Sequence, residues 1–115
     1  MAKVLSIHEY SLKKGVKPKT FENAVKRARR RGLFNLPGLE RYHFMRRLRG
    51  KSEPDYAAVW IYRSREAWAA LWGDVSNPCS KESYPANWQI WEQEILAPLL
   101  DRDPDRIDYA AYQEF

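Results

Sequence analysis

The segment Tyr56–Tyr62, with the sequence YAAVWIY, is apolar at every position, and no other feature narrows the possible folds as much. Side chains alternate between the two faces of a β-strand, and a strand with one face toward water normally alternates apolar and polar residues. Because neither face of this strand suits water, we expect helices against one face and a second copy of the chain against the other. One face would carry Tyr56, Ala58, Trp60 and Tyr62, and the other would carry Ala57, Val59 and Ile61.

Hydrophobic periodicity and chain-breaking residues place the remaining elements around this strand. Ser64 stands where an N-cap is expected before an apolar helical pattern, and Gly73 is placed to end that helix. Residues 74–87 are expected to form an irregular insertion before the next helix. The predicted strands are Val4–Leu12, Leu39–Leu48 and Ile107–Tyr112, and the predicted helices cover Pro18–Arg31, the residues between Ser64 and Gly73, and Trp88–Leu99.

The order of these elements is strand, helix, strand, strand, helix in two pieces, strand. With short connections and right-handed crossovers, this order most simply gives four antiparallel strands in the spatial order 4-1-3-2, with the helices on one face. We therefore predict an α+β protein with a ferredoxin-like β-α-β-β-α-β fold. A chain of 115 residues that is 44% hydrophobic has enough apolar material for one core, so residues 1–115 are expected to form a single domain.

The cellular setting is predicted from what the sequence lacks. Cys79 is the only cysteine, which excludes an intrachain disulfide and the spacing of a zinc finger. The first residues lack the apolar stretch of a signal peptide, and the apolar run Tyr56–Tyr62 is far shorter than the roughly 20 residues of a membrane helix. We expect a cytoplasmic protein that does not associate with membranes.

The charge of the chain is divided between its two halves. Residues 1–51 contain 15 Lys and Arg against 3 Asp and Glu, a balance of +12, whereas residues 52–115 contain 5 against 12, a balance of −7. Such asymmetry fits a nucleic-acid surface or two complementary surfaces, and we favour the second interpretation because Lys26–Arg31 spreads its cations around a solvated helix. An RNA-recognition fingerprint fails, since Asp55 and Ala58 stand where a basic residue and a stacking ring are expected. We predict no specific nucleic-acid partner.

His8 and His43 are the two residues whose unperturbed pKa lies near neutrality, and both fall on predicted strands. They are candidate catalytic residues if they flank an aromatic pocket, and the alternative is a pair of hydrogen-bonded histidines in the sheet. Alternation does not decide which face either histidine occupies. The aromatic residues could likewise wall a pocket for a small, flat, apolar ligand or simply fill the core. The candidate substrate-binding residues are Tyr10, Trp60 and Tyr62, with Tyr84 on a lid formed by the insertion.

Other chemical motifs are not evident. No metal-ligand cluster, Gly-rich phosphate loop or nucleophile motif stands out, and we predict neither a metal nor a cofactor. Glu92 and Glu94 are two positions apart on a predicted helix, so they face different directions and do not form a carboxylate pair.

Three longer segments carry a family resemblance that spans nearly the whole chain. They are GLFNLPGLERYHFMRRLRG, YAAVWIYRSREAWAALWG and EILAPLLDRDPDRI. The chain resembles the dimeric α+β barrel superfamily, which includes antibiotic-biosynthesis-type monooxygenases, and within it a group of uncharacterised small bacterial proteins. The resemblance implies two ferredoxin-like protomers packed sheet against sheet. Haem-degrading members carry an Asn on the first strand and a His on a helix, and this sequence departs from both features.

Two main functions follow as hypotheses. The first is a homodimeric small-molecule pocket protein, such as a cofactor-independent monooxygenase or isomerase acting on an aromatic or polyketide-like compound. The second is a non-catalytic stress-response or interaction module with a filled core. A basic nucleic-acid binder is a third and weaker hypothesis. A cavity lined by a histidine would favour the first hypothesis, and a sealed interior would favour the second.

Overall fold

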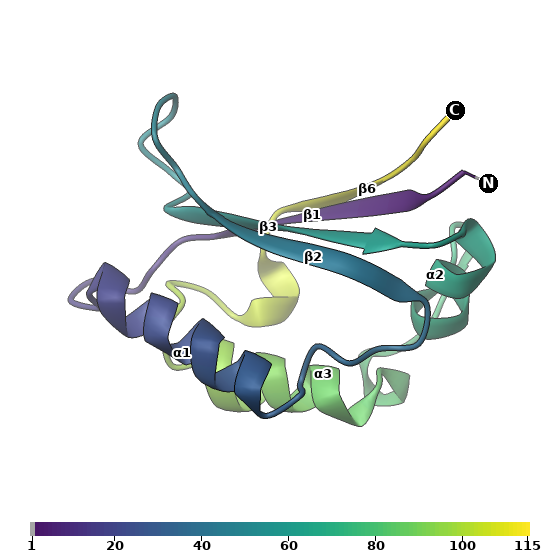
Figure 1. Cartoon of the computed structure of the whole chain (residues 1–115). Helices are drawn as coiled ribbons and strands as arrows, with labels where there is room; N and C mark the ends of the chain where they lie inside the picture. Colours follow the sequence, from purple (N-terminus) through teal and green to yellow (C-terminus); the bar gives the residue numbers. More distant parts are fainter. Residues whose placement is uncertain (1) are drawn as a thin grey trace.

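A computed structural model describes residues 2–115 and has a four-stranded antiparallel sheet at its centre (Figure 1). The strand order is β2-β3-β1-β6, which is the predicted order 4-1-3-2 viewed from the other edge. The fold prediction is therefore confirmed, and the doubly apolar segment forms a central strand with its predicted bounds. The strands are β1 (Val4–Tyr10), β2 (Leu39–Arg46), β3 (Tyr56–Tyr62) and β6 (Tyr109–Gln113).

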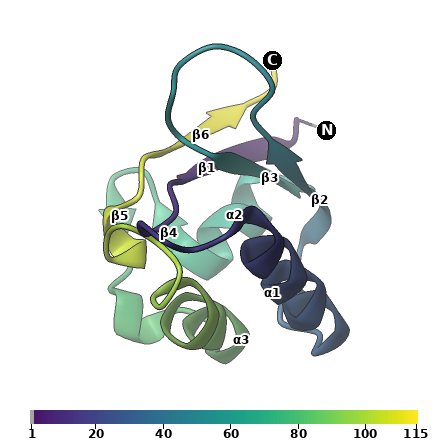
Figure 2. The same ribbon diagram turned by 90° about the vertical axis from the view of Figure 1, so that its left-hand side faces the viewer.

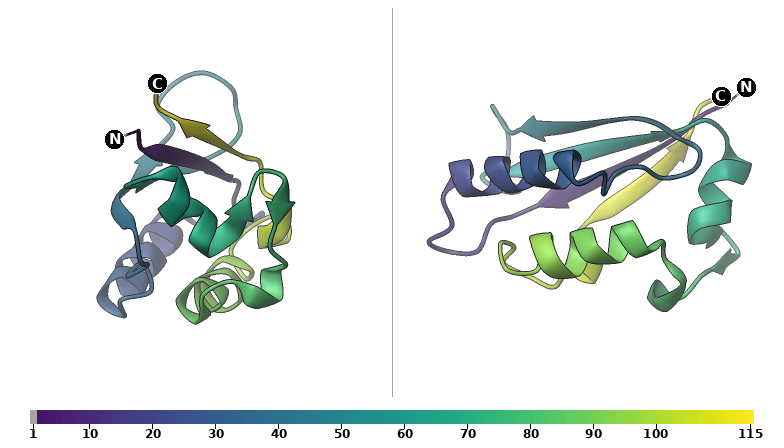
Figure 3. Two further views of the ribbon diagram at one scale, coloured as in Figure 1. Left: turned by 90° about the vertical axis from the view of Figure 1, so that its right-hand side faces the viewer. Right: turned by 60° about the horizontal axis from the view of Figure 1, so that its bottom comes forward.

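The helices cover one face of this sheet. Helices α1 (Pro18–Arg30) and α3 (Ala86–Ile90) lie side by side beneath it, and α2 (Arg65–Trp72) lies at one end of it (Figures 1, 2 and 3). The predicted N-cap is confirmed, because the Ser64 hydroxyl accepts a hydrogen bond of 3.1 Å from the Ala67 N–H. Among residues 2–115, none of the helices combines the length and apolar character needed to cross a membrane.

The last helical segment differs from the single α-helix that was predicted. After α3 the chain continues as a π-helix, η2 (Trp91–Leu96), in which the Ala97 N–H donates to the Glu92 carbonyl five residues earlier at 2.9 Å. The π-helical segment is little more than one turn long, and over so short a segment the sequence pattern does not separate the two kinds of helix. A π-helical turn is rare and often occurs at functional sites.

Three further boundaries differ from the predictions. Residues 74–87 are not wholly irregular, because β4 (Gly73–Asp74) and β5 (Asn77–Pro78) form a small hairpin followed by the 3-10 helix η1 (Lys81–Ser83). Strands β1 and β2 end two residues earlier than predicted. The last strand begins two residues later, because Ile107 follows the 3-10 helix η3 (Pro104–Arg106) and packs against the core.

The helix-covered face of the sheet is aromatic. Trp60 and Tyr62 on β3 and Tyr10 on β1 are almost completely buried there. Phe34, from the loop after α1, contacts Trp60 and Trp91 with ring centroids 5.3 and 4.9 Å apart, so this ring joins the sheet to the π-helical segment. The core therefore lies between the sheet and the α1 and α3 layer.

The opposite face of the sheet, called here the open face, carries no helix in the described part of the chain (Figure 1). Its centre is apolar, and Val59 lies between His43 of β2 and Ile7 of β1 in the strand register. The prediction that β3 has two apolar faces is thus confirmed, with Trp60 toward the helices and Val59 away from them. The open-face residues of the four strands are Leu5, Ile7, Glu9, Arg41, His43, Met45, Ala57, Val59, Ile61, Ala110 and Tyr112.

Candidate functional site

His8 lies on the helix-covered face and is enclosed by aromatic rings from three other elements. Its ring centroid is 5.9 Å from that of Trp60, 5.8 Å from that of Trp88 on α3 and 5.8 Å from that of Tyr109 on β6. Alternation along β1 places Ser6 on the same face, and its hydroxyl lies 3.0 Å from His8 Nε2. The second ring nitrogen, Nδ1, is buried and has no hydrogen-bond partner.

Burial determines the protonation of His8. It lowers the pKa of the imidazole to about 4, because the charged form would lose its hydration among apolar rings. His8 is therefore neutral at pH 7 and can both donate and accept a hydrogen bond. An imidazole with so low a pKa is a weak proton acceptor, which makes it better suited to orient a ligand than to act as the base.

A row of aromatic side chains extends from His8 toward solvent. Trp88 contacts Trp72 of α2, and Trp72 contacts Tyr84, with ring centroids 5.2 and 5.1 Å apart. The Trp72 indole N–H donates to the Tyr62 hydroxyl at 3.1 Å. The outer rings of this row, Trp72 and Tyr84, are half-buried. We call this group the aromatic site: His8, Tyr62, Trp72, Tyr84, Trp88 and Tyr109.

The structure brings together five of the six predicted site residues. Four of them, Tyr10, Trp60, Tyr62 and Tyr84, lie with His8 between the sheet and the helices, although Tyr10 and Trp60 are deeper than the rest. His43 does not join them. It is exposed on the open face, because β2 places it beside Val59 on the opposite side of the sheet. The two histidines therefore do not share a site within one chain.

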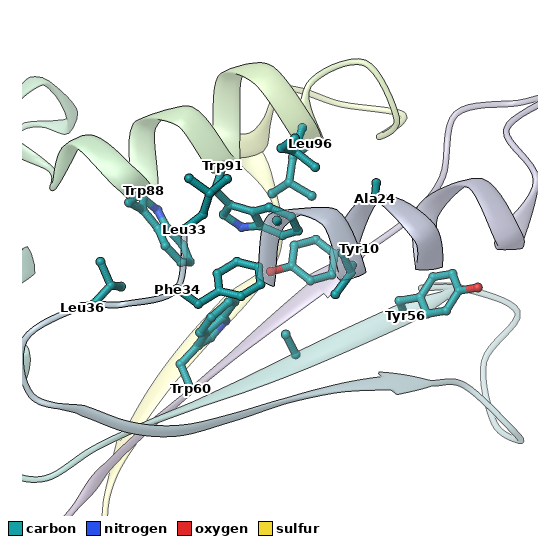
Figure 4. Packing of buried hydrophobic residues seen from close by; sticks show 14 of the residues in the cluster. Tyr10, Ala24, Leu33, Phe34, Leu36, Tyr56, Trp60, Trp88, Trp91 and Leu96 are labelled. Carbon is teal, nitrogen blue, oxygen red and sulfur yellow. The ribbon is translucent and has the colours of Figure 1, made fainter. Parts of the chain in front are cut away.

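A second group, called here the polar triad, lies in the centre of the core. It consists of Tyr10, Trp60 and Trp91. Figure 4 shows the Tyr10 hydroxyl directed toward the indole nitrogens of the two tryptophans. Burial raises the pKa of Tyr10, and the two indole N–H groups partly oppose this shift. The hydroxyl and both indole nitrogens nevertheless lack a partner at hydrogen-bonding geometry. Buried polar groups are normally paired, so these three atoms need an explanation.

Three surface hollows lie outside the aromatic site, and Phe34, which contacts Trp60 and Trp91, lines one of them. The largest of the three, about 740 Å³, is on the open face beside Leu5, Ile7 and Tyr112. One of about 540 Å³ lies outside the loop 34–39, and one of about 520 Å³ lies between Glu9 and the loop 51–54. Neither histidine lines any of these three hollows. Within residues 2–115, no three His, Cys, Asp or Glu side chains are grouped to hold a metal ion.

Comparison with solved structures identifies the fold. A DABB-family protein with a ferredoxin-like fold from Mesorhizobium loti superposes with a TM-score of 0.64 at 8% identity, over 100% of this chain and 97% of that chain. The chain is ferredoxin-like. No protein-family model matches its sequence, and no curated protein matches it.

Two other solved structures are similar to this ferredoxin-like chain. SnoaB, a cofactor-independent oxygenase from Streptomyces nogalater, has a TM-score of 0.59 at 13% identity, over 100% of this chain and 95% of SnoaB. A dimeric ferredoxin-like protein of unknown function from Thermobifida fusca has a TM-score of 0.54 at 18% identity, over 98% and 90% of the two chains. At such identities the likeness establishes the fold, and activity has to be argued from the site.

Glu92 is a candidate site residue that the sequence-based prediction missed. It lies one turn after Trp88, and burial raises the pKa of its carboxyl to about 7, while the Trp88 indole N–H opposes the shift. A carboxyl with a pKa near 7 is a better proton acceptor at neutral pH than His8. The signal was present in the helical pattern, because Glu92 interrupts an apolar stripe that otherwise consists of Trp88, Trp91, Ile95, Leu96 and Leu99.

Some of the cations on the basic helix α1 contact other residues of the same chain. The Arg31 guanidinium pairs with Glu94 at 2.9 Å, and Arg29 lies over the Tyr42 ring, 5.5 Å from its centroid. Lys26, Arg27 and Arg30 are exposed. The pair between Arg31 and Glu94 agrees with the predicted complementarity of the two halves.

The exposed cations of α1 are expected to bind nucleic acid only weakly. Each phosphate that they neutralise contributes about −0.9 to the slope of log affinity against log salt, so binding should fade at physiological salt. Fluorescence anisotropy with a labelled duplex and a labelled single strand at 50 and 150 mM salt measures this. A K26Q/R27Q/R30Q variant should lose the residual binding. Submicromolar affinity at 150 mM salt would contradict the prediction.

Proposed function

We propose that this chain is a homodimeric small-molecule-binding protein whose aromatic site takes an aromatic or polyketide-like compound. We further propose that it acts on this ligand as a cofactor-independent monooxygenase, with dioxygen as co-substrate, or as an isomerase. One observation carries the proposal: four polar atoms are buried among aromatic rings without partners. They are His8 Nδ1, the Tyr10 hydroxyl and the indole nitrogens of Trp60 and Trp91.

These unpaired atoms support a binding site for a polar group because a core filled by side chains alone would not need them. Burying a hydrogen-bonding group without a partner costs roughly 1–3 kcal/mol, whereas apolar rings of similar size would carry no such cost. The half-buried rings of Trp72 and Tyr84 lie between His8 and solvent, so small movements of these two side chains would open a path. In this proposal Tyr84 is the lid residue.

The roles of the two titratable groups follow from their pKa values. Glu92, whose pKa is raised to about 7, is the proposed proton acceptor for a ligand hydroxyl or acidic C–H group. His8, whose pKa is lowered to about 4, is proposed to orient the ligand through its unpaired Nδ1. Both groups adjoin Trp88, which is the proposed wall between them.

The homodimer is supported by the open face. Two such sheet faces packed together would be comparable with a standard protein interface, which buries roughly 1,600 Å² over both partners. The similar ferredoxin-like protein from Thermobifida fusca is described as dimeric. The basic strand β2 and the acidic region around Asp103, Asp105 and Asp108 lie at opposite edges of the sheet. A two-fold axis could therefore bring each basic edge near the acidic edge of the partner.

The test uses 1-naphthol as a planar aromatic probe. Quenching of tryptophan fluorescence should report saturable binding, and chromatography after incubation in air should report turnover. H8A is expected to weaken binding at least tenfold. E92Q should keep binding and lower turnover about 100-fold, with the wild-type rate rising through the pKa of Glu92, because removing a general base typically costs a factor of 10² to 10⁴. E94Q is the matched control for E92Q and should leave both measurements unchanged, because Glu94 is exposed and pairs with Arg31 on the surface.

The non-catalytic module remains the second candidate because the three hollows lie away from His8. It predicts a different outcome of the same experiment. Neither 1-naphthol nor other planar aromatic compounds would bind, and H8A would only lower the free energy of unfolding by about 1–3 kcal/mol through loss of the contact with Ser6. That combination would exclude the catalytic role of His8.

A further inference from the structure

The polar triad contains three hydrogen-bond donors and one acceptor oxygen, so its members cannot all find partners among themselves. Tyr10, Trp60 and Trp91 are each 0% exposed, so bulk solvent does not reach their polar atoms. An indole N–H is only a donor, and the two tryptophans therefore cannot pair with each other. The Tyr10 oxygen is the one acceptor in the triad. Both indole N–H groups lie close enough to it to oppose the rise in its pKa, but neither contact reaches the distance and angle of a full hydrogen bond.

The three groups come from three different elements and point toward one region. Tyr10 projects from β1, Trp60 from β3 and Trp91 from the first residue of the π-helix η2 (Figure 4). Phe34 packs edge-on against both tryptophans and closes the region from the side of the loop after α1. The donors are therefore fixed by surrounding packing and not by one another.

The π-helical turn is an independent sign that this arrangement is selected. It widens the helix by one residue per turn directly after Trp91, and its bond from the Ala97 N–H to the Glu92 carbonyl is 2.9 Å long. Such turns are rare and concentrate at functional sites, because an inserted residue changes the direction of nearby side chains at some cost in helix stability. Here the change falls between Trp91 and Ile95, both of which are buried against the sheet.

We propose that the Tyr10 hydroxyl and the indole N–H groups of Trp60 and Trp91 form a buried binding site for one acceptor oxygen atom. The two indoles donate to this oxygen, and the Tyr10 hydroxyl either donates to it or accepts from it. The oxygen belongs either to an internal water molecule or to a carbonyl or hydroxyl group of a bound ligand. Internal waters characteristically make about three hydrogen bonds to buried groups that lack other partners.

This inference rests on the proposed function only where the bound oxygen comes from a ligand. An oxygen that comes from water does not depend on the proposed function. If no small molecule enters the aromatic site, the water-derived oxygen remains, and the polar triad is then a structural hydration site. If a small molecule binds the aromatic site while both indole N–H groups of the triad show neither a bound water nor a ligand-dependent shift, the proposed function stands and this inference fails. The two failures are therefore distinguishable.

Nuclear magnetic resonance of ¹⁵N-labelled protein tests the site directly. The indole N–H protons of Trp60 and Trp91 should show rotating-frame cross-peaks to one bound water, and adding phenol should remove these cross-peaks and shift both resonances if a ligand oxygen replaces the water. Trp72 is an internal reference for the water cross-peaks only, because its indole N–H already donates to the Tyr62 hydroxyl.

The variant Y10F removes one oxygen and keeps the ring. It should abolish the water cross-peaks or, where phenol binds, weaken phenol about tenfold, the effect of losing one hydrogen bond of about 1.4 kcal/mol. Y112F is the matched control, since Tyr112 lies on the open face, on the other side of the sheet from the triad. The proposal is overturned if both indole N–H groups show neither a water cross-peak nor a phenol-dependent shift in the folded wild-type protein.

Discussion

Replacing Val59 with lysine is expected to convert a stable homodimer into monomers or aggregates. Val59 lies at the centre of the open face, between His43 and Ile7 in the register of the sheet. In the proposed dimer the lysine ammonium would be buried without a partner, which costs several kcal/mol in place of the apolar burial at about 25 cal/mol per Å² that valine contributes. We expect a loss of at least 100-fold in dimer affinity.

Sedimentation or light scattering at micromolar concentration measures this change. V75K is the matched control, because Val75 is 72% exposed in the turn between β4 and β5 and belongs to no face of the main sheet. The control should remain dimeric. A wild-type protein that is a well-behaved monomer, or a V59K variant that dimerises normally, would rule out the sheet-to-sheet dimer.

Acidification from pH 7 to pH 4 is expected to remove about 3 kcal/mol of the stability that depends on His8. The pKa of His8 is lowered to about 4 in the folded chain, against 6.5 for an unperturbed histidine. Between these two values the unfolded chain binds a proton that the folded chain does not, so its contribution to stability is complete above pH 6.5 and falls as the pH falls. A difference of about 2.5 pKa units corresponds to roughly 3 kcal/mol.

Urea unfolding of the wild type and of H8Q at pH 7 and pH 4.5 isolates this effect. Glutamine keeps a hydrogen-bonding group near Ser6 and does not titrate, so the stability advantage of the wild type should shrink or reverse on acidification. The comparison between variants is needed because Glu92 acts in the opposite direction. Its pKa is raised to about 7, so its contribution to stability is lost as the pH rises from 4.5 through 7. A wild-type advantage that does not change with pH would contradict the burial of His8.

The faces of the strands could be predicted, but the site could be predicted only in part. Alternation along β3 correctly placed Val59 opposite Trp60. It did not relate His8 to His43, because two strands separated by a third have no relative phase until the register of all three is known. The structure places these histidines on opposite faces. Glu92 was missed because its raised pKa depends on burial, which the helical pattern does not determine.

The linear order of elements and their periodicity determined the architecture of this protein. Short connections and right-handed crossovers leave few ways to join six elements, and an apolar strand such as Tyr56–Tyr62 must lie at the centre. Tertiary structure alone decided the chemistry. The low pKa of His8, the high pKa of Glu92 and the unpaired polar atoms of Tyr10, Trp60 and Trp91 all arise from desolvation by residues distant in the chain. Desolvation depends on three-dimensional packing density, which no local pattern of residues encodes.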